Sequence, residues 1–375
     1  MKFTLSTKPL QNVIGLGIIK ANISPYFARS ASVQLTATGD TLKLNVEAIG
    51  IKTRMLLKGS GDTDEPVTDI VDCQVFKGLI DSIDNDVITI EFLPQGISVH
   101  AGRSNFSIPR LSDAESVQLE EPKSDAQTSD TVTITAADWQ FVRDHQMYAV
   151  STSDAHPVYR NVWVGEDHGV IVGDYDIGMF TYSKHGSFNT SCILPTSLIN
   201  LFTSIPEGST ITKFGDSYGL SVETDSYSMF TEFTPKYESD SAVGSYNSEI
   251  ILKMFTHPDV SAAINIAPLL KFMNQMAIVT QPGVDKLFNL TVSGGTLTLS
   301  NRVSSYSMPV DTDAEYSVTF LASLLKKVLS NLDSDEIHMA PVLRTTTGAD
   351  GQPSVRAIGG LFWTDEVTTV LAGQG

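Results

Sequence analysis

The chain has 375 residues and carries 43 acidic against 25 basic side chains, which gives a formal net charge of −18. This charge argues against a protein that coats nucleic acid with its whole surface, although a small basic face can coexist with an acidic exterior. The hydrophobic content of 41% describes a globular chain that can bury a core, and no apolar run reaches the ~18 residues that a membrane span needs.

The first residues, MKFTLSTKPLQNV, alternate polar and apolar side chains and then take helical spacing. They lack the charged head and apolar core of a secretory signal. The two cysteines, Cys73 and Cys192, allow neither a CxxC pair nor a disulfide framework, so we expect reduced structural thiols. Both observations predict a cytoplasmic protein.

Two elements recur along the chain at intervals of roughly 125 residues, the size of one domain. The first is a helix end, a polar loop, a strand, a tight turn and a second strand, at residues 17–46, 149–174 and 277–301. The second is an amphipathic helix, an acidic or Pro/Gly turn and a short strand, at residues 75–92, 197–214 and 323–340. Each copy therefore has two helices that feed into strands, which indicates an α+β protein of three repeated domains.

Polar stretches separate the copies. Residues 112–130 are charged, contain proline and have few large apolar side chains, and residues 235–248 share this composition. We therefore expect domain boundaries that give segments 1–124, 125–248 and 249–375.

Catalytic motifs are missing from the sequence. The seven histidines show no HExxH spacing, and there is no GxSxG elbow, P-loop or GxGxxG run after a predicted strand. Asp174 and Asp176 come closest to a paired acidic site, but carboxylates in a turn are usually solvated. The sequence therefore predicts neither an enzyme nor a metal or cofactor site.

Basic side chains are sparse on the predicted helices but recur in all three copies. Any one of them can be an ordinary solvated residue of a helix face. As a set they can form a thin basic lining, made of Lys8, Lys20, Lys77, Arg143, Lys271, Lys326 and Lys327.

The opening MKFTLSTKPLQNV, the run SVHAGRSNFSIPRL at residues 98–111 and the three-fold repeat together resemble the β sliding clamp, the beta subunit of bacterial DNA polymerase III. The strongest local matches are Met1 to Thr4, Lys8 to Val13 and Gly102 to Ser107, whereas the second and third copies match by pattern. Such uneven similarity fits a phage-encoded or otherwise divergent member.

The resemblance implies the DNA clamp fold, in which each domain packs two helices on antiparallel sheets and two chains close into a ring. It also implies a processivity factor that encircles double-stranded DNA without reading sequence and tethers a DNA polymerase, in the cytoplasm of a bacterium or of a phage-infected host. The partners implied are DNA, a second copy, and the polymerase and clamp loader, which bind through short peptides. Two alternatives remain, a clamp-fold interaction scaffold that no longer encircles DNA and an enzyme acting on nucleic acid.

The resemblance also assigns residues to three sites. The DNA-contacting helix-end loop corresponds to Lys20 in the first copy and to Thr152 and Ser153 in the second, beside the basic residues above. The contact between two copies corresponds to Phe76, Leu79, Ile80 and Phe106 on one chain and Ile278 and Val279 on the other, with core burial as the alternative for each. The partner-peptide pocket corresponds to Tyr175, Ile177, Val370 and Leu371, although GDYDIG and the C-terminal TVLAGQG depart from the family's pattern.

Overall fold

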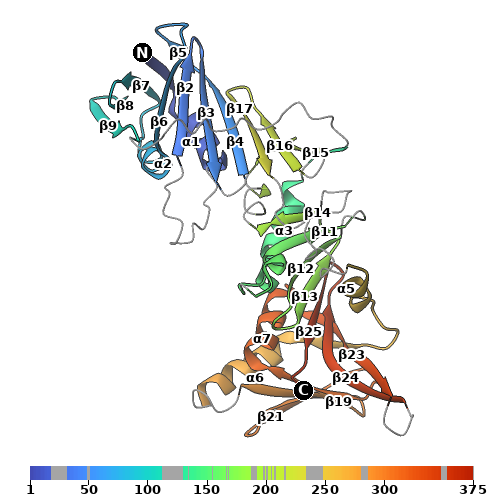
Figure 1. The fold of residues 1–375 in the computed structure, drawn as a ribbon. Coiled ribbons are helices and arrows are strands. Elements are labelled where there is room, and N and C mark those ends of the chain that lie inside the picture. Colours follow the sequence, from blue (N-terminus) through green and yellow to red (C-terminus); the bar gives the residue numbers. More distant parts are fainter. Residues whose placement is uncertain are drawn as a thin grey trace. The chain divides into compact units, whose positions relative to one another are not determined.

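The computed structural model describes residues 1–17, 32–48, 51–111, 130–133, 135–153, 155–165, 167, 169–186, 192–196, 199, 202–203, 205–206, 208–214, 217–233, 248–279, 286–347 and 353–374. The chain divides into two compact units (Figure 1). The first contains residues 1–136 and 200–236, and the second contains residues 137–199 and 237–375.

Unit 1 consists of two antiparallel sheets and two helices, α1 (Thr7–Gly17) and α2 (Cys73–Asp81). Its five-stranded sheet has the order β5 (Ser60–Gly61), β1 (Lys2–Ser6), β7 (Val87–Leu93), β8 (Gly96–Ala101) and β9 (Ser104–Pro109). Its eight-stranded sheet has the order β10 (Asp130–Thr133), β15 (Thr210–Phe214), β16 (Ser217–Glu223), β17 (Tyr227–Phe233), β4 (Ile51–Lys58), β3 (Thr41–Ala48), β2 (Ser32–Thr38) and β6 (Val67–Asp72).

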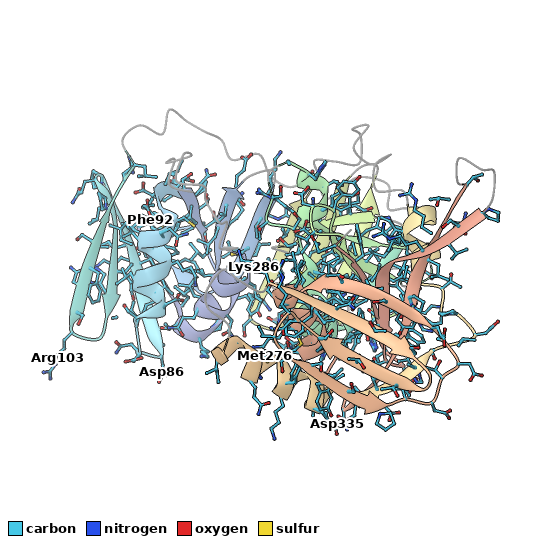
Figure 2. All side chains as sticks on the ribbon, turned by 90° about the horizontal axis from the view of Figure 1, so that it is seen from below. Asp86, Phe92, Arg103, Met276, Lys286 and Asp335 are labelled. Carbon is cyan, nitrogen blue, oxygen red and sulfur yellow. The ribbon has the colours of Figure 1, made fainter. Side chains whose placement is uncertain are left out.

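Polar side chains fix the two helices of unit 1 in place. The Asp72 carboxylate caps α2 by accepting hydrogen bonds from the backbone N–H groups of Gln74 and Val75, both at 2.9 Å. Gln11 on α1 donates from Nε2 to the carbonyl oxygens of Ile80 and Ile83, at 3.0 and 2.9 Å. The C-terminal end of α2 and the residues just after it are thereby bound to α1. Figure 2 shows Arg103 at the tip of the turn that joins β8 and β9.

Unit 2 also has two antiparallel sheets. Its eight-stranded sheet has the order β14 (Cys192–Pro195), β11 (Asn161–Val164), β12 (Val170–Asp174), β13 (Met179–Ser183), β25 (Val367–Ala372), β24 (Pro353–Trp363), β23 (Glu336–Thr347) and β18 (Ala262–Asn265). Its four-stranded sheet has the order β21 (Ser305–Pro309), β20 (Thr296–Ser300), β19 (Leu287–Ser293) and β22 (Tyr316–Leu321). The helices are α3 (Ala136–His145), α5 (Ser248–Met254), α6 (Ile266–Val279) and α7 (Ala322–Asn331), with 3₁₀ turns at Met147–Ala149 and Pro157–Arg160.

A buried amide attaches the end of α3 to the larger sheet of unit 2. Gln146 has no exposed surface, donates from Nε2 to the carbonyl of Val170 at 3.0 Å and accepts from the Ser183 hydroxyl at 2.8 Å. Tyr148 adds a 2.8 Å hydrogen bond to Thr369 on β25. Because a buried polar group without a partner is costly, these bonds fix the segment that leads into the loop after residue 149.

The predicted helix, turn and strand are present twice, as α2 followed by β7 and as α7 followed by β23. The helix predicted after residue 196 lies largely outside the described residues, as do most of the two polar stretches. Strands of the middle segment, 125–248, belong to both units: β10 and β15 to β17 lie in unit 1, and β11 to β14 lie in unit 2. The division into three domains stays a prediction. Within the described part of the chain, each helix is too short or too polar to span a bilayer.

Candidate functional site

The basic residues of unit 1 differ in their surroundings. Lys8 is exposed on α1. Lys77 on α2 has only 17% of its side chain exposed and lies 2.7 Å from the Asp81 carboxylate one turn later. The charge of Lys77 is therefore largely compensated within its own helix. Lys20 lies outside the described residues.

The basic residues of unit 2 lie on three helices. Lys326 and Lys327 are exposed on α7, whose other face buries Leu325, Val328 and Leu329. Figure 1 shows α6 and α7 side by side, and Lys271 is exposed on α6.

Another basic residue of unit 2, Arg143, is exposed on α3 and lies 2.9 Å from Asp144. The His145 imidazole, next along α3, lies 3.9 Å from Asp333, just after α7. The structure thus places the helices of Arg143, Lys326 and Lys327 close together within this unit.

The loop of Thr152 and Ser153 is fixed by a residue that the sequence analysis missed. Arg160 donates from Nε to the Ser153 carbonyl at 2.9 Å and from Nη2 to the Thr152 carbonyl at 2.8 Å. The Ser153 hydroxyl accepts the backbone N–H of Ala155 at 3.2 Å, whereas the Thr152 side chain is exposed. Arg160 therefore fixes the backbone of this loop and leaves Thr152 facing solvent. A basic residue shortly after a polar loop was the available signal.

The residues assigned to the contact between copies separate into buried and exposed groups. Phe76 and Ile80 have no exposed surface in the single chain, so core packing accounts for them. Leu79 is half-buried on the same helix. Phe106 is 39% exposed on β9, the last strand of its sheet, and Ile278 is 86% exposed at the end of α6. The side chain of Val279 lies outside the described part.

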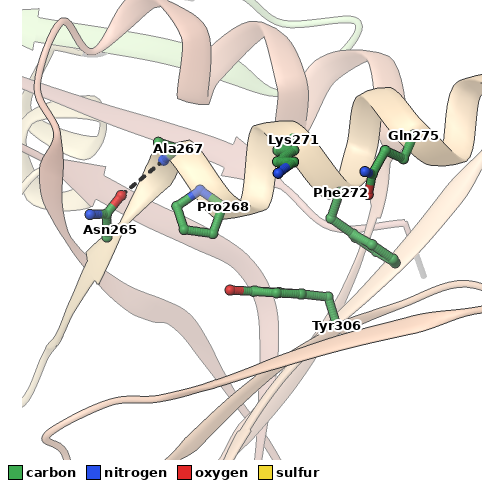
Figure 3. Close-up of a pocket in the computed structure, with 7 residues that line it drawn as sticks. All are labelled: Asn265, Ala267, Pro268, Lys271, Phe272, Gln275 and Tyr306. Atoms are coloured by element: carbon green, nitrogen blue, oxygen red, sulfur yellow. Dashed lines mark hydrogen bonds between the residues drawn. The ribbon is translucent and has the colours of Figure 1, made fainter.

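A pocket of about 550 Å³ opens between α6 and β21 (Figure 3). The Phe272 and Tyr306 rings stack in it with centroids 5.8 Å apart and an interplanar angle of 30°. Asn265, whose Oδ1 accepts the backbone N–H of Ala267 at 3.0 Å, lies at the entry to α6. The wall is completed by Pro268, Lys271 and Gln275. Among the described residues β21 is the edge strand of its sheet, so the pocket lies beside a sheet edge that no described strand covers.

Tyr175 and Ile177 lie in the turn between β12 and β13. Tyr175 is 59% exposed and stacks on Tyr159, with ring centroids 5.7 Å apart and an interplanar angle of 15°. The His156 ring meets Tyr175 edge-on at 5.0 Å. Burial, and secondarily the neighbouring Tyr175, raises the pKa of Tyr159. This turn therefore presents an aromatic surface on a packed base.

The C-terminal strand β25 lies beside that turn, since the backbone N–H of Ala372 donates to the Gly178 carbonyl at 2.8 Å. Val370, 5% exposed, belongs to the same buried cluster as Tyr159, whereas Leu371, 1% exposed, is the next residue of the strand and faces the other side of the sheet. The Asp174 carboxylate accepts the backbone N–H of Asp176 at 3.0 Å and thus shapes the turn. Among the described residues, no three His, Cys, Asp or Glu side chains are grouped so that they can hold a metal.

Comparison with solved structures identifies the fold. The chain matches the Caulobacter crescentus polymerase III beta protein over all of both chains, with a TM-score of 0.74 and 14% identity. A Pseudomonas aeruginosa DNA polymerase III subunit beta matches over all of both chains, with a TM-score of 0.72 and 15% identity. A Bacillus subtilis DNA polymerase sliding clamp matches all of this chain and 99% of its own, with a TM-score of 0.69 and 13% identity. No protein-family model and no curated protein matches the sequence. The chain therefore has the sliding-clamp fold, as predicted.

Proposed function

We propose that the chain is a DNA sliding clamp, a non-enzymatic ring of two copies that encircles duplex DNA and tethers a replicative polymerase. The observation that carries this proposal is the match to sliding clamps over the whole length of the chain, at TM-scores from 0.69 to 0.74. A shared fold can serve different functions, so the function depends on the residues exposed at the sheet edges and on the helices.

Two sheet edges that no strand of the described residues covers support ring closure. β9 ends the five-stranded sheet of unit 1, and β21 ends the four-stranded sheet of unit 2. Exposed edges invite pairing with another chain, and closing a ring of two copies would cover all four of them. Phe106 on β9 is an exposed aromatic residue, and the pocket with Phe272 beside β21 is large enough to accept one. An aromatic side chain in such a pocket is the usual anchor of a protein interface.

Sparse exposed bases support non-specific DNA contact. Lys8, Lys326 and Lys327 face solvent from helices and are the residues that we assign to phosphate contacts, together with Lys271. Lys77 contributes less because Asp81 compensates it. Phosphate contacts hold DNA without reading sequence, and few of them are needed when a ring retains DNA by enclosing it.

The turn at Tyr175 and Ile177 is the surface that we assign to short peptides of the polymerase and the clamp loader. Its exposed tyrosine stacks on Tyr159, which belongs to the same buried apolar cluster as Val370, and this surface suits an apolar side chain of a peptide. The three domains at 1–124, 125–248 and 249–375 and a cytoplasmic site of action belong to the same proposal.

Retention on circular and linear duplex DNA tests the function. Loaded protein should stay on a nicked circle and leave a linear duplex of the same length through its ends. Blocking the ends of the linear duplex with bound protein should restore retention. Equal loss from circles and open linear DNA, with a solution mass of two copies, would favour the scaffold that no longer encircles DNA.

A further inference from the structure

Strands β23 and β24 extend beyond the sheet to which they belong. β18 pairs with β23 only from Glu336 to Met339, and β25 pairs with β24 only from Gly359 to Trp363. From Leu343 to Thr347 and from Pro353 to Ala357, the two strands are paired with each other alone among the described residues. Figure 1 shows this hairpin running past the neighbouring strands. We call residues 343–347 and 353–358 the arm.

The arm starts at an irregularity that changes its direction. The pairing register shifts between Val342 and Leu343, where Val342 pairs with Gly359 and Leu343 pairs with Ala357. Ile358 is therefore an extra residue on β24, which is a β-bulge, and bulges bend and twist a strand pair. The bulge therefore lies at the point where the arm leaves the sheet.

One face of the arm is apolar and exposed. Leu343 and Val355 lie on this face, because Leu343 pairs with Ala357 and Val355 pairs with Thr345. Their exposed fractions are 57% and 60%, and Ile358 at the bulge is 41% exposed. A two-stranded ribbon is marginally stable in water, and exposed apolar side chains that are grouped together mark a binding surface.

The opposite face carries two arginines directly across from each other. Arg344 and Arg356 are cross-strand partners, and both are exposed. Like charges in this position destabilise a strand pair. Within the described part of the chain, neither guanidinium has a carboxylate within salt-bridge distance. An acidic group from another molecule would remove this repulsion.

The base of the arm adjoins the exposed turn of Tyr175. Gly373 donates its backbone N–H to the Ile358 carbonyl at 2.7 Å, and Ala372 donates to the Gly178 carbonyl at 2.8 Å. β25 therefore ends between the arm and the β12–β13 turn. The pairing of this segment with β24 ends at the bond between Gly373 and Ile358. From Pro353 to Ala357, the same edge of β24 has no described strand beside it.

We propose that the arm binds an extended, acidic segment of a partner protein, which adds as a strand to the free edge of β24 in line with β25. Backbone hydrogen bonds along the edge supply affinity, and alternate side chains supply specificity. Apolar side chains of the segment cover the face of Leu343 and Val355, and its carboxylates meet Arg344 and Arg356. Protein is favoured over nucleic acid because the exposed apolar face has no counterpart in a phosphate backbone. The inference does not depend on ring formation.

Peptide binding to the full chain, followed by fluorescence anisotropy, tests this assignment. The probe is a labelled peptide of about eight residues, a typical strand length, in which Glu alternates with Val. A second peptide carries Lys at every Glu position, and a 20-base-pair duplex is the nucleic-acid probe. We expect the Glu peptide to bind about tenfold more tightly than the Lys peptide, because two arginine contacts contribute about 1–2 kcal/mol.

Substitutions in the arm then distinguish the contribution of the two arginine charges to peptide affinity from that of the apolar face. The double variant Arg344→Glu/Arg356→Glu should reverse the preference between the two peptides, and Val355→Asp should weaken the Glu peptide by at least about tenfold. Arg103→Glu, at the exposed β8–β9 turn, is the matched control and should leave both affinities unchanged. Thermal melting of each variant should match the wild type, because the arm lies outside both cores.

Three results would overturn the proposal: no binding of either peptide, equal binding of both, or an unchanged preference in the double arginine variant. A loss of duplex binding in that variant, with unchanged peptide binding, would assign the arm to nucleic acid instead.

Discussion

Lys77 and Asp81 form an ion pair of 2.7 Å across one turn of α2, with only 17% of the lysine side chain exposed. Its position on a predicted helix, together with the resemblance to sliding clamps, placed Lys77 among the bases expected to contact DNA. A lysine on the expected helix can therefore be paired with a carboxylate of the same helix. The basic residues of this chain consequently differ in how strongly they can bind phosphate.

Replacing Asp81 with Asn is therefore expected to strengthen DNA binding. Removing the carboxylate frees the Lys77 ammonium, and the affinity for duplex DNA at low salt should rise by a factor of about 2 to 5, the value of an exposed ion pair. Equilibrium binding to a short duplex across a salt series measures this. Asp62→Asn removes the same charge from an exposed loop and should have a smaller effect. Equal gains in the two variants would mean that net charge alone is responsible.

Charge reversal on α7 is expected to weaken retention on DNA. Lys326→Glu/Lys327→Glu should lower the affinity for duplex DNA and reduce the slope of log affinity against log salt by about 2, because each lost phosphate contact reduces it by about 0.9. The control Lys184→Glu/Lys253→Glu changes the net charge equally at exposed positions outside α6 and α7. The assignment of α7 to DNA would be wrong if both double variants changed the slope to the same extent.

Phe106→Ala is expected to separate the two copies. Removing an anchor aromatic from an interface costs about 2 kcal/mol or more, so the dimer should dissociate at concentrations at least about 30-fold higher. Light scattering over a dilution series should show a shift from two copies toward the 40.6 kDa chain. Tyr175→Ala removes an exposed aromatic residue from a different surface and should leave the mass unchanged. An unaltered dimer in the Phe106 variant would place the interface elsewhere.

The sequence predicted the elements better than their pairing. Helical spacing after residue 75 and after residue 323 identified α2 and α7, because amphipathic periodicity is a local signal. Pairing of β17 with β4, in which the Thr53 and Thr231 hydroxyls are 3.1 Å apart, joins strands far apart in the chain. Nothing in either strand specifies the other, since any strand with a matching apolar face fits.

In the candidate site too, local features were predicted from the sequence and contacts between distant elements were not. Phe106 was assigned to the contact between copies from the local GRSNF run, and this assignment stays a prediction. The structure shows Phe106 exposed on an edge strand. The stacking of Phe272 on Tyr306 joins separate elements, so no local pattern reveals it. Arg160 lies soon after the polar loop that it binds, which is only a weak local signal. The arm escaped prediction for another reason: alternation identifies a strand, but it does not show where neighbouring strands stop.

Gly178→Ala is expected to destabilise the turn beside Tyr175. Gly178 has φ +61°, and an added Cβ would lie 2.5 Å from the Cβ of Ala372. Left-handed backbone and this contact together should cost about 1–3 kcal/mol and weaken peptide binding at the turn. Gly15→Ala on α1, where an added Cβ meets nothing within 4 Å, should instead stabilise the chain by up to about 1 kcal/mol. Denaturant unfolding measures the free energy of unfolding of both variants. A Gly178→Ala variant as stable as the wild type would contradict the prediction.

Unit 2 is expected to lose stability at mildly acidic pH. His257 stacks on Trp363 with ring centroids 4.5 Å apart, and its Nε2 lies 2.9 Å from the Thr368 hydroxyl. Burial, and secondarily the neighbouring His338, lowers the pKa of His257 below 6.5. Above pH 6.5 both the folded and unfolded chains keep His257 neutral, and its stabilising effect is fully present. As the pH falls below 6.5, the unfolded chain takes up a proton first, so stability decreases until the folded-state pKa is passed.

His257→Asn removes this titration and keeps a polar group next to Thr368. The variant should be less stable than the wild type at neutral pH, but its melting temperature should fall less between pH 7 and pH 5. His100→Asn is the control, because His100 lies in unit 1, where its Nε2 is 3.0 Å from Glu91, and it should leave the melting of unit 2 unchanged. If the melting temperature fell equally with pH in the wild type and in the His257 variant, another group would control the acid sensitivity. A smaller fall of the melting temperature in the His257 variant alone would assign that sensitivity to the imidazole packed on Trp363.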